Sequence, residues 1–442
     1  MAGDVLVIGA GPAGLSAAVA ASRAGADTML LERYGCFGGV ITTVGMETLG
    51  WYRYEGTTDV EGIGIEMEKM AARMNPNSTK FAFNESECLD AEMFKLVADN
   101  LVEESGVRPL LHTFVVDTIK EGHTITGVIV ESKSGRMVVR AKRIIDCTGD
   151  ADVAYFAGAK CRQNKKQDAM GLTQVFNAAG VNTKLFKEHI ANNSATYADW
   201  SEGEWQQQTT GKEESLKSPY LSKEFTQAAA EGIVPANLPG QSLGGTWSGI
   251  SDAGEATNLN LVHMKGFNPL DVRDLTKAEM IGRKNALNAL IVLKNKLPGF
   301  ENSKLRNFGM TIGIRDSRKI IGQYNLTGDD VLDQARFEDS IGIFPEFIDG
   351  YGILILPTTG RYFQLPYRAM LPKGVRHLLV TGRSAGGDRD SHAAVRNMMC
   401  CAVNGQGAGV AAAISVQTGV DVADVDIKLV QKKLLEQGAR IH

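Results

Sequence analysis

The sequence predicts an α/β fold, and three observations within its first 32 residues support that prediction. Residues 5–8 (VLVI) form a short apolar run typical of a buried strand, and a G-x-G-x-x-G motif follows it at once. An alanine-rich segment with the composition of a helix comes next. A second apolar run, residues 28–31, then ends at Glu32. This order of strand, glycine-rich turn, helix, strand and acid is typical of a Rossmann-like dinucleotide-binding unit.

The three glycines of the motif have distinct physical roles. Gly9 permits a tight turn, Gly11 lets the backbone approach a pyrophosphate, and Gly14 lets the helix pack closely on the strand. The N–H groups at the start of that helix then face the anion. Glu32 follows Gly14 by eighteen residues. In dinucleotide-binding units a carboxylate at about this spacing accepts hydrogen bonds from the adenosine ribose. An ordinary βα turn is the alternative interpretation. We find no second motif of this kind, which favours one dinucleotide.

Composition limits the classes of partner. The 442 residues suffice for two or three domains, and 43% of them are hydrophobic. The formal net charge is −4 and no lysine- or arginine-rich block occurs, so we expect neither a nucleic acid nor a membrane as partner. The six cysteines include no C-x-x-C pair, which predicts reduced thiols and no metal site. No basic segment precedes the first apolar run, so we expect a cytoplasmic protein rather than a secreted one.

The next part of the chain predicts a helix followed by sheet. Residues 90–105 place apolar side chains at helical spacing. Three β segments with turn residues between them are expected to form a meander: residues 107–116, 124–132 and 136–143. A further strand, in residues 143–152 (RIIDCTGDAD), runs into a small-residue turn where a backbone could again approach a ligand.

The segment of residues 182–252 matches no motif that we recognise. It is polar and contains Trp200, Trp205 and Trp247. Inserted loops vary while a scaffold stays fixed, so we expect this segment to shape the entry of the substrate.

Several motifs together resemble a known family. The glycine motif with Glu32, the pair Gly38-Gly39, the meander, IIDCTGDAD and the C-terminal GRSAGGDRDSHAAVRNMMCCAVNGQGAG are similar to FAD-dependent oxidoreductases related to the succinate dehydrogenase and fumarate reductase flavoproteins. The resemblance covers residues 1–165 and 350–442 and extends to residues 313–331. It implies a glutathione-reductase-type, three-layer FAD-binding domain built from residues 1–165 plus 350–442. An α+β substrate domain, residues 166–349, is inserted between the two segments.

The resemblance also implies which residues contact FAD. The expected cofactor-binding residues are Gly9, Gly11, Pro12, Ala13, Gly14, Glu32, Arg33, Gly38, Gly39, Val115, Thr148, Gly149, Gly382 and Arg383. Relatives with covalent flavin use a histidine soon after the first motif, whereas the first histidine here is His112, which favours dissociable FAD. A flavin-proximal thiol is one interpretation of Cys36, and a buried structural cysteine is the favoured one. The family points the N-terminus of a helix such as the one starting near Asn397 at the flavin, where its dipole stabilises the reduced form.

Three residues are candidates for the chemistry. His392 and Arg396, four apart, resemble the H-G-x-N-R pattern with which fumarate reductase-like enzymes hold a substrate carboxylate, although the asparagine is missing. Residues four apart share a helical face, so both could bind one anion. Local hydrogen bonding is the alternative for this pair. Arg315 is the third candidate, as a proton donor, and a surface ion-pair cluster with Arg318 is its alternative.

Two tyrosines near the C-terminal motif also allow two interpretations. Tyr362 and Tyr367 could serve as phenol donors, and core packing is the favoured interpretation of both.

We therefore expect an FAD-dependent oxidoreductase, a dehydrogenase, oxidase or reductase. It would transfer a hydride between flavin N5 and a small polar substrate, for which a carboxylate is one option. The alternative is a flavin-binding protein of the same fold with a non-redox or RNA-modification-associated role. The substrate, the direction of the reaction, and the electron acceptor or donor stay open, and a homo-oligomer is expected by analogy alone.

Overall fold

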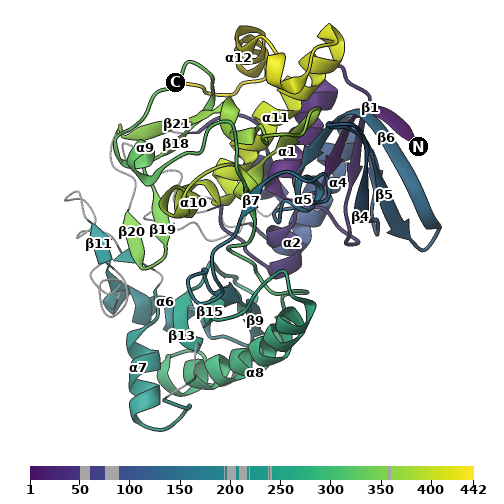
Figure 1. The fold of residues 1–442 in the computed structure, drawn as a ribbon. Coiled ribbons are helices and arrows are strands. Elements are labelled where there is room, and N and C mark those ends of the chain that lie inside the picture. Colours follow the sequence, from purple (N-terminus) through teal and green to yellow (C-terminus); the bar gives the residue numbers. More distant parts are fainter. Residues whose placement is uncertain are drawn as a thin grey trace.

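The computed structural model describes residues 1–49, 60–74, 89–193, 195–196, 206–208, 217–218, 220–236, 238, 241–355 and 360–442. Both chain ends lie in the larger, upper part of the molecule, and helix α8 (Val272–Lys296) lies along the far edge of the lower part (Figure 1). Trp200 and Trp205 of the segment expected to shape substrate entry lie outside the described residues.

The larger part is built on a seven-stranded sheet. Its order is β3 (Arg108–Leu110), β2 (Thr28–Leu31), β1 (Ala2–Ile8), β6 (Gly135–Asp146), β5 (Thr124–Ser132) and β4 (Phe114–Glu121), with β22 (Leu378–Val380) also paired to β6. Strand β1 runs parallel to β2 and β6, and β22 runs parallel to β6. The predicted α/β class with a parallel sheet is confirmed.

Two predicted strand boundaries were wrong. Residues 136–143 and the strand after them form one continuous strand, β6, whose first half pairs antiparallel with β5 and whose second half pairs parallel with β22. Residues 107–116 are split between β3, which is parallel to β2, and β4, which belongs to the meander. His112 lies between the two strands and has φ 51°, in the left-handed region, at the point where the chain passes from the first pairing to the second.

Side chains of β1 alternate between two hydrophobic layers. Val5 and Val7 pack in the core that contains α1 (Pro12–Arg23), α3 (Ile63–Met74), α4 (Ala91–Glu104) and α11 (Met398–Thr418). Leu6 and Ile8 pack in the core on the opposite face, with the meander and α5 (Asp152–Phe156). Period-two alternation on a central strand therefore produces helices, sheet and meander as three layers, as predicted.

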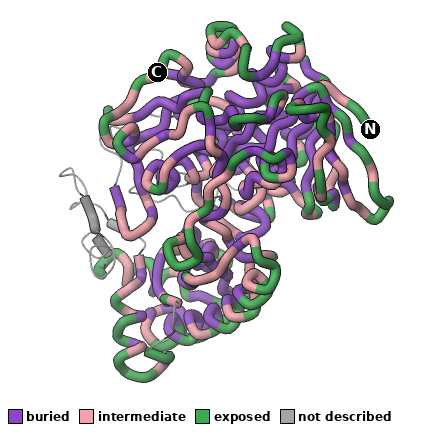
Figure 2. The backbone as a smooth tube through the Cα atoms, viewed as in Figure 1, coloured by how far each residue is buried: buried purple, intermediate pink, exposed green. Residues whose placement is uncertain are grey.

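Helix α11 is long and apolar enough to cross a membrane by length and composition. It is nevertheless a core helix, because 94% of its apolar window is buried inside the protein. Glycines allow it to approach α1: an added Cβ at Gly405 would lie 2.0 Å from the Ala13 carbonyl oxygen, and one at Gly409 would lie 2.2 Å from that of Ala17. In Figure 2 the interior of the larger part, where this helix runs, is coloured mostly as buried.

The smaller part has a core of its own. Its sheet has the order β13 (Gln241–Thr246), β15 (Glu255–Met264), β9 (Phe176–Ala179) and β16 (Lys304–Phe308), with β14 (Gly249–Ile250) and β8 (Leu172–Thr173) also paired to β15. The buried hydrophobic residues of this core run from Leu172 to Ile312, and α8 contributes several of them. Buried residues 326–348 instead join the core of the larger part, so the second core is narrower than the 166–349 domain expected from the sequence.

The remaining described elements belong to one of these two parts or connect them. They are α2 (Val40–Val44), β7 (Cys161–Arg162), α6 (Thr183–Asn192), β10 (Ala195–Thr196), β11 (Gln206–Gln208), β12 (Lys217–Ser218), α7 (Lys223–Ala230), β17 (Lys319–Ile320), α9 (Gly328–Leu332), β18 (Ser340–Pro345), β19 (Ile348–Gly350), β20 (Ile353–Ile355), β21 (Tyr362–Pro366), α10 (Arg389–Val395) and α12 (Ile427–Glu436). Three short 3₁₀ turns lie at Tyr367–Met370, Gly382–Ser384 and Val422–Asp424.

Candidate active site

A cavity of about 830 Å³ lies where the two parts meet, and most of the predicted site residues line it. The predicted residues in its wall are Gly9, Gly11, Pro12, Ala13, Glu32, Arg33, Gly39, Val115, Thr148, Gly149, Arg315, Gly382, Arg383 and Arg396. Gly14, Gly38 and His392 are absent from the wall. The sequence therefore predicted one continuous site from segments that are far apart in the chain.

The geometry of the glycine motif is compatible with the roles expected of its three glycines. Gly9 has φ 94°, and an added Cβ would lie 2.5 Å from the carbonyl oxygen of Cys147. An added Cβ at Gly14 would lie 1.7 Å from the Gly9 carbonyl oxygen, so this glycine permits close packing and does not face a ligand. Gly11 differs, because its added Cβ would meet nothing nearer than the Cα of Gly39 at 3.8 Å and the residue borders the cavity.

The N-terminus of α1 is open toward this cavity. Gly11 is its N-cap and offers no side chain to the first N–H groups, and Pro12 occupies the first turn. Gly11, Pro12 and Ala13 all line the cavity. Uncapped N–H groups at a helix start form an anion site, which suits a pyrophosphate.

Glu32 lies beside the same turn, buried in the cavity wall. Its Oε2 accepts from the backbone N–H of Ala10 at 2.7 Å, and its Oε1 accepts from that of Tyr34 at 3.0 Å. These two bonds fix the carboxylate between the glycine turn and the next strand. Each carboxylate oxygen keeps a lone pair for a further donor, such as a ribose hydroxyl.

The turn after β6 is stabilised by a buried acid. Asp146 accepts from the N–H of Thr148 at 3.0 Å, from its hydroxyl at 2.7 Å and from the N–H of Ala154 at 2.9 Å. Arg383 supports the turn from the other side, because its Nη2 donates to Asp150 at 2.7 Å. Thr148 and Gly149 are thereby held in the cavity wall.

A second open helix N-terminus reaches the cavity. Asn397 is the N-cap of α11, makes no side-chain cap bond, and donates its amide instead to the carbonyls of Ala393 and Ala394. Asn397 and Met398 line the cavity. These features fit FAD: two uncapped helix starts, a glycine with open space beside it, and a fixed carboxylate. The start of α1 suits the pyrophosphate, and the start of α11 suits the electron-rich end of the flavin.

The end of the cavity formed by the smaller part carries Arg315. Its Nη1 donates to the Gly171 carbonyl at 3.2 Å and to Nδ1 of His263 at 3.2 Å, and its Nη2 donates to the Asn260 amide oxygen at 3.3 Å. All three acceptors are neutral. Burial, and then the charge of Arg396, lower the pKa of Arg315 to about 10. Within the described residues this guanidinium makes no hydrogen bond to a carboxylate.

His263 supports Arg315 as a neutral base. Burial, followed by the charge of Arg315, lowers the pKa of His263 to about 3. A guanidinium can only donate, so Nδ1 of His263 is the acceptor and Nε2 carries the proton. Backbone carbonyls of Gly244 and Asn260 accept from this ring.

Arg396 approaches the cavity from the larger part. It is the C-cap of α10, and its Nη2 donates to the backbone oxygen of Asp349 and, at 2.9 Å, to its carboxylate. The Nε of Arg396 is buried without a hydrogen-bond partner in the described part of the chain. Arg315 and Arg396 therefore place two guanidinium groups in the wall of one cavity.

The structure does not bring His392 and Arg396 together on one anion. His392 is 2% exposed, does not line the cavity, and hydrogen-bonds through Nε2 to the carbonyl of Arg315 at 3.0 Å. Burial holds the pKa of His392 well below its usual range, so the ring is neutral. For His392 the structure therefore agrees with the alternative interpretation, a hydrogen bond to a protein group in place of a bond to a substrate anion. Helical spacing holds, because the N–H of Arg396 donates to the carbonyl of His392 at 3.0 Å, but the two side chains have different partners: the Arg315 carbonyl for His392 and Asp349 for Arg396.

A buried polar network lies behind His392. Lys319 and Asp316 form an ion pair at 2.6 Å, with side chains 3% and 1% exposed. The other oxygen of Asp316 accepts from the Tyr351 hydroxyl at 2.8 Å and from the Asn164 amide at 2.8 Å. This network fixes the loop that carries Arg315 and orients Tyr351, which lines the cavity.

The other sequence alternatives also have structural outcomes. Arg318 is half-buried beside Asp152, so the ion-pair interpretation applies to Arg318 and not to Arg315. Tyr367 is buried and donates to the Val422 carbonyl at 2.6 Å, as core packing predicted. The ring of Tyr362 lies under the guanidinium of Arg336. The Cys36 thiol donates to the Thr42 hydroxyl at 3.6 Å and lies outside the cavity wall, but it is half-buried and not buried as the favoured interpretation had it.

Among the cavity residues that sequence analysis missed are four polar ones near the two arginines: Asn260, His263, Asp349 and Tyr351. Asn260 and His263 lie on β15, which comes from a region without a recognisable motif. Asp349 and Tyr351 lie on or after β19, at a tight turn where Tyr351 has φ 55° and Gly352 has φ 83°. The dipeptide Tyr-Gly between two apolar runs was the available signal for this hairpin.

Comparison with known proteins agrees with the site. The model of the family described as FAD-dependent oxidoreductase matches residues 4–434. The chain belongs to the FAD-dependent oxidoreductase family. Its cofactor is FAD, and it is a redox enzyme of that family.

Curated relatives match parts of this oxidoreductase. Thiamine thiazole synthase of Metallosphaera sedula is 30% identical over 173 residues, 36% of this chain and 58% of that protein. Digeranylgeranylglycerophospholipid reductase of Picrophilus torridus is 29% identical over 181 residues, 39% of this chain and 45% of that protein. A solved geranylgeranyl bacteriochlorophyll reductase-like protein from Thermoplasma acidophilum covers 100% of this chain and 85% of its own, at TM-score 0.47 and 14% identity. The matched regions span about half the length of the two curated relatives.

Proposed function

We propose that this oxidoreductase transfers a hydride between flavin N5 and a small anionic substrate whose carboxylate is bound by Arg315 and Arg396. The resemblance to fumarate reductase-like enzymes suggested a carboxylate, and the cavity supports it with a different pair of residues from the one expected. A cytoplasmic location and dissociable FAD remain part of the proposal.

The observation that carries the proposal is the hydrogen bonding of Arg315. A buried charge is costly unless a counter-charge or hydrogen bonds compensate it. Arg315 has three neutral acceptors, and its guanidinium borders open space rather than a carboxylate of the described protein. A substrate anion would supply the missing charge through charge-assisted hydrogen bonds.

Residues of both parts would orient the substrate. FAD supplies the hydride chemistry when bound. Arg396 is held by Asp349, so its guanidinium is fixed before a substrate arrives. His263 and Asn260 fix Arg315 in the same way. Such fixed donors lower the cost of orienting a substrate beside the cofactor.

Arg315 is also the proposed proton donor if the reaction runs as a reduction. Its pKa of about 10 is lower than that of an ordinary arginine, because of burial and Arg396. His392 is excluded from direct proton transfer by its place behind the cavity wall. Proton donation requires contact with the substrate, and the position of Arg315 in the cavity wall supports this role.

Titration of the purified holoenzyme with a panel of small carboxylates tests the proposal. A substrate anion at this site should perturb or bleach the flavin absorbance, and matched neutral amides or alcohols should not. The Arg315→Gln variant should retain its flavin spectrum and lose the carboxylate response. A response to neutral compounds alone, or an unchanged response in Arg315→Gln, would contradict an anionic substrate.

A further inference from the structure

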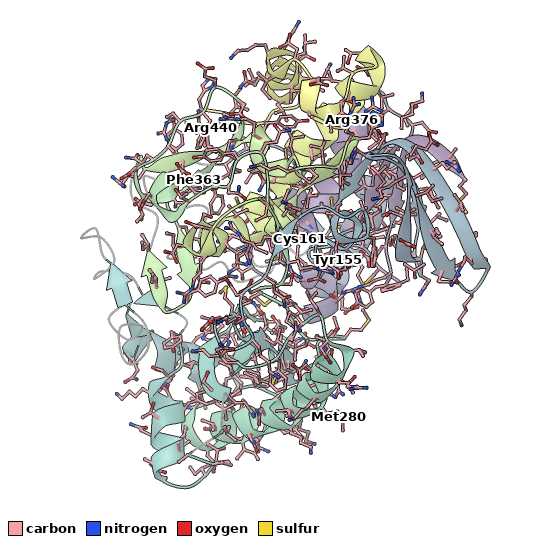
Figure 3. The ribbon with its side chains drawn as sticks, viewed as in Figure 1. Tyr155, Cys161, Met280, Phe363, Arg376 and Arg440 are labelled. Atoms are coloured by element: carbon pink, nitrogen blue, oxygen red, sulfur yellow. The ribbon has the colours of Figure 1, made fainter. Side chains whose placement is uncertain are left out.

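The outer face of α8 carries large apolar side chains that no other described part of the molecule covers. Val272 is 75% exposed, Met280 56%, Leu287 45% and Ile291 43%. Most large apolar side chains of the protein are buried, whereas these four lie on one helix of the smaller part. Figure 3 shows Met280 at the outer edge of the molecule, pointing away from it.

Helix geometry places the four side chains in one stripe. Successive residues of an α-helix turn by about 100°, so Val272, Met280, Leu287 and Ile291 fall within an arc of about 100°. With a rise of about 1.5 Å per residue they extend over about 28 Å. The opposite face of α8 packs in the core of the smaller part, with Ala278, Ala286 and Ala289 fully buried. The stripe is therefore a straight ridge on a firmly anchored helix.

Positive charges accompany the stripe: by helical angle Arg273, Lys277 and Lys284 lie along one side of it, and Lys294 lies within it. Arg273, Lys277, Lys284 and Lys294 are exposed, and none of them forms an ion pair with a described residue. Arg283 is the exception, because it pairs with Glu279 at 2.9 Å.

The acidic residues of α8 and its cap are already engaged. Asp271 caps the helix N-terminus, Asp274 pairs with Lys166 at 2.8 Å, and Glu279 accepts from Thr311 and from the N–H of Ile312. By helical angle, Asp271 and Asp274 lie away from the stripe and Glu279 lies at its edge. The outer face of α8 therefore combines an apolar stripe with positive charges along one of its sides and, at Arg283 and Lys294, within it.

We propose that this face of α8 docks the enzyme on an anionic lipid surface. Apolar side chains flanked by lysine and arginine are the chemistry with which a helix lies in a membrane interface. The sequence suggested no membrane partner because it lacks a basic block, but these four cations are spread over 22 residues and gather only when the helix forms.

A second copy of the chain fits this face less well. A two-fold interface places the same patch on itself, so the unpaired cations of one α8 would meet those of the other. The unpaired cations therefore favour an anionic lipid surface as the occupant.

Sedimentation of the FAD-loaded enzyme with lipid vesicles tests the proposal. The enzyme should bind vesicles that contain phosphatidylglycerol at low salt, lose that binding at high salt, and leave pure phosphatidylcholine vesicles unbound. Because of the stripe, Met280→Glu and Leu287→Glu should each lower the bound fraction at least tenfold. Leu429→Glu and Leu435→Glu are matched controls, since those leucines are equally exposed on α12.

Each other outcome overturns the proposal. Absence of binding to anionic vesicles at low salt would contradict the proposal. Equal binding by the α8 variants and the wild type would also contradict it. A concentration-dependent dimer that Met280→Glu dissociates would assign the face to a second copy instead. An unchanged flavin spectrum in each variant verifies that the variants are folded.

Discussion

The imidazole of His392 donates from Nε2 to the backbone carbonyl of Arg315 at 3.0 Å, so the histidine holds the residue that faces the substrate. A carbonyl oxygen only accepts, which fixes the proton on Nε2. The same ring nitrogen lies 3.8 Å from Asp316 Oδ1, but burial keeps the pKa of His392 well below its usual range. His392 is therefore a positioning residue, and its charge plays no part in the site.

Substitution of His392 should change the placement of Arg315 without changing the pH dependence. His392→Leu leaves the Arg315 carbonyl buried and unsatisfied, and we expect kcat/KM for the carboxylate to fall about tenfold. His392→Gln keeps a donor and should lose less. The pH profile between about pH 6 and 8 should keep its shape in both variants. The opposite result has two parts: kcat/KM of the wild type declines as pH rises through about 6.5, and the decline is absent in His392→Leu. That result would favour a charged His392 that binds the anion.

The two cavity arginines should govern affinity for the anion and leave FAD binding intact. Arg315→Gln and Arg396→Gln each remove a buried donor to the carboxylate, which we expect to weaken binding by about 100-fold or more. Arg336→Gln is a matched control, because Arg336 stacks on Tyr362 away from the cavity. Isothermal titration of the holoenzyme measures the affinity. Equal losses in the control, or release of FAD from the cavity variants, would contradict the assignment.

The sequence predicted the cofactor half of the site better than the substrate half, for a physical reason. The roles of Gly9, Gly11 and Gly14 follow from local backbone requirements, which one short segment contains completely. The surroundings of Arg315 depend on β15, and the pairing of β15 with β8 and β13 is a long-range event. No local sequence pattern predicts that Asn260 and His263 will hydrogen-bond to an arginine more than fifty residues later in the chain.

The predicted pairing of His392 with Arg396 fails because of what each side chain contacts. Spacing gives the two residues the same face of a helix, and the hydrogen bond from the N–H of Arg396 to the carbonyl of His392 at 3.0 Å keeps that helical register. His392 nevertheless hydrogen-bonds to the carbonyl of Arg315, and Arg396 hydrogen-bonds to Asp349. Both partners come from segments far from α10 in the sequence, so spacing within one helix could not indicate them.

Alanine substitutions at two glycines of the first motif should have different effects, one on stability and the other on FAD affinity. Gly14→Ala would place a methyl group 1.7 Å from the Gly9 carbonyl oxygen, so we expect a strong loss of stability, visible as a lower Tm of the apoprotein. Gly11→Ala has 3.8 Å of clearance and should leave that Tm nearly unchanged. Its methyl group borders the cavity and should lower affinity for FAD in a fluorescence titration. If Gly11→Ala kept the FAD affinity of the wild type, the assignment of the pyrophosphate to this turn would be contradicted.

The buried carboxyl of Glu47 should make stability depend on pH near neutrality. Burial raises its pKa to about 7, and its Oε1 accepts from the N–H of Ala91 at 3.1 Å. Because the folded pKa is above the unfolded value of 4.5, the contribution of this group to stability is fully present below about pH 4.5 and is lost as pH rises through about 7. The shift corresponds to about 3 kcal/mol.

Comparison with the neutral isostere isolates this contribution. Glu47→Gln keeps an acceptor for Ala91 and removes the titration, so the two proteins should have similar Tm values near pH 5. Near pH 8.5 the variant should unfold at a temperature a few degrees higher than the wild type, because the wild type must then ionise a buried group. Thermal unfolding of both apoproteins across this range measures the difference. A Tm difference that stays constant with pH, or that favours the wild type at high pH, would show that Glu47 ionises freely in the folded protein.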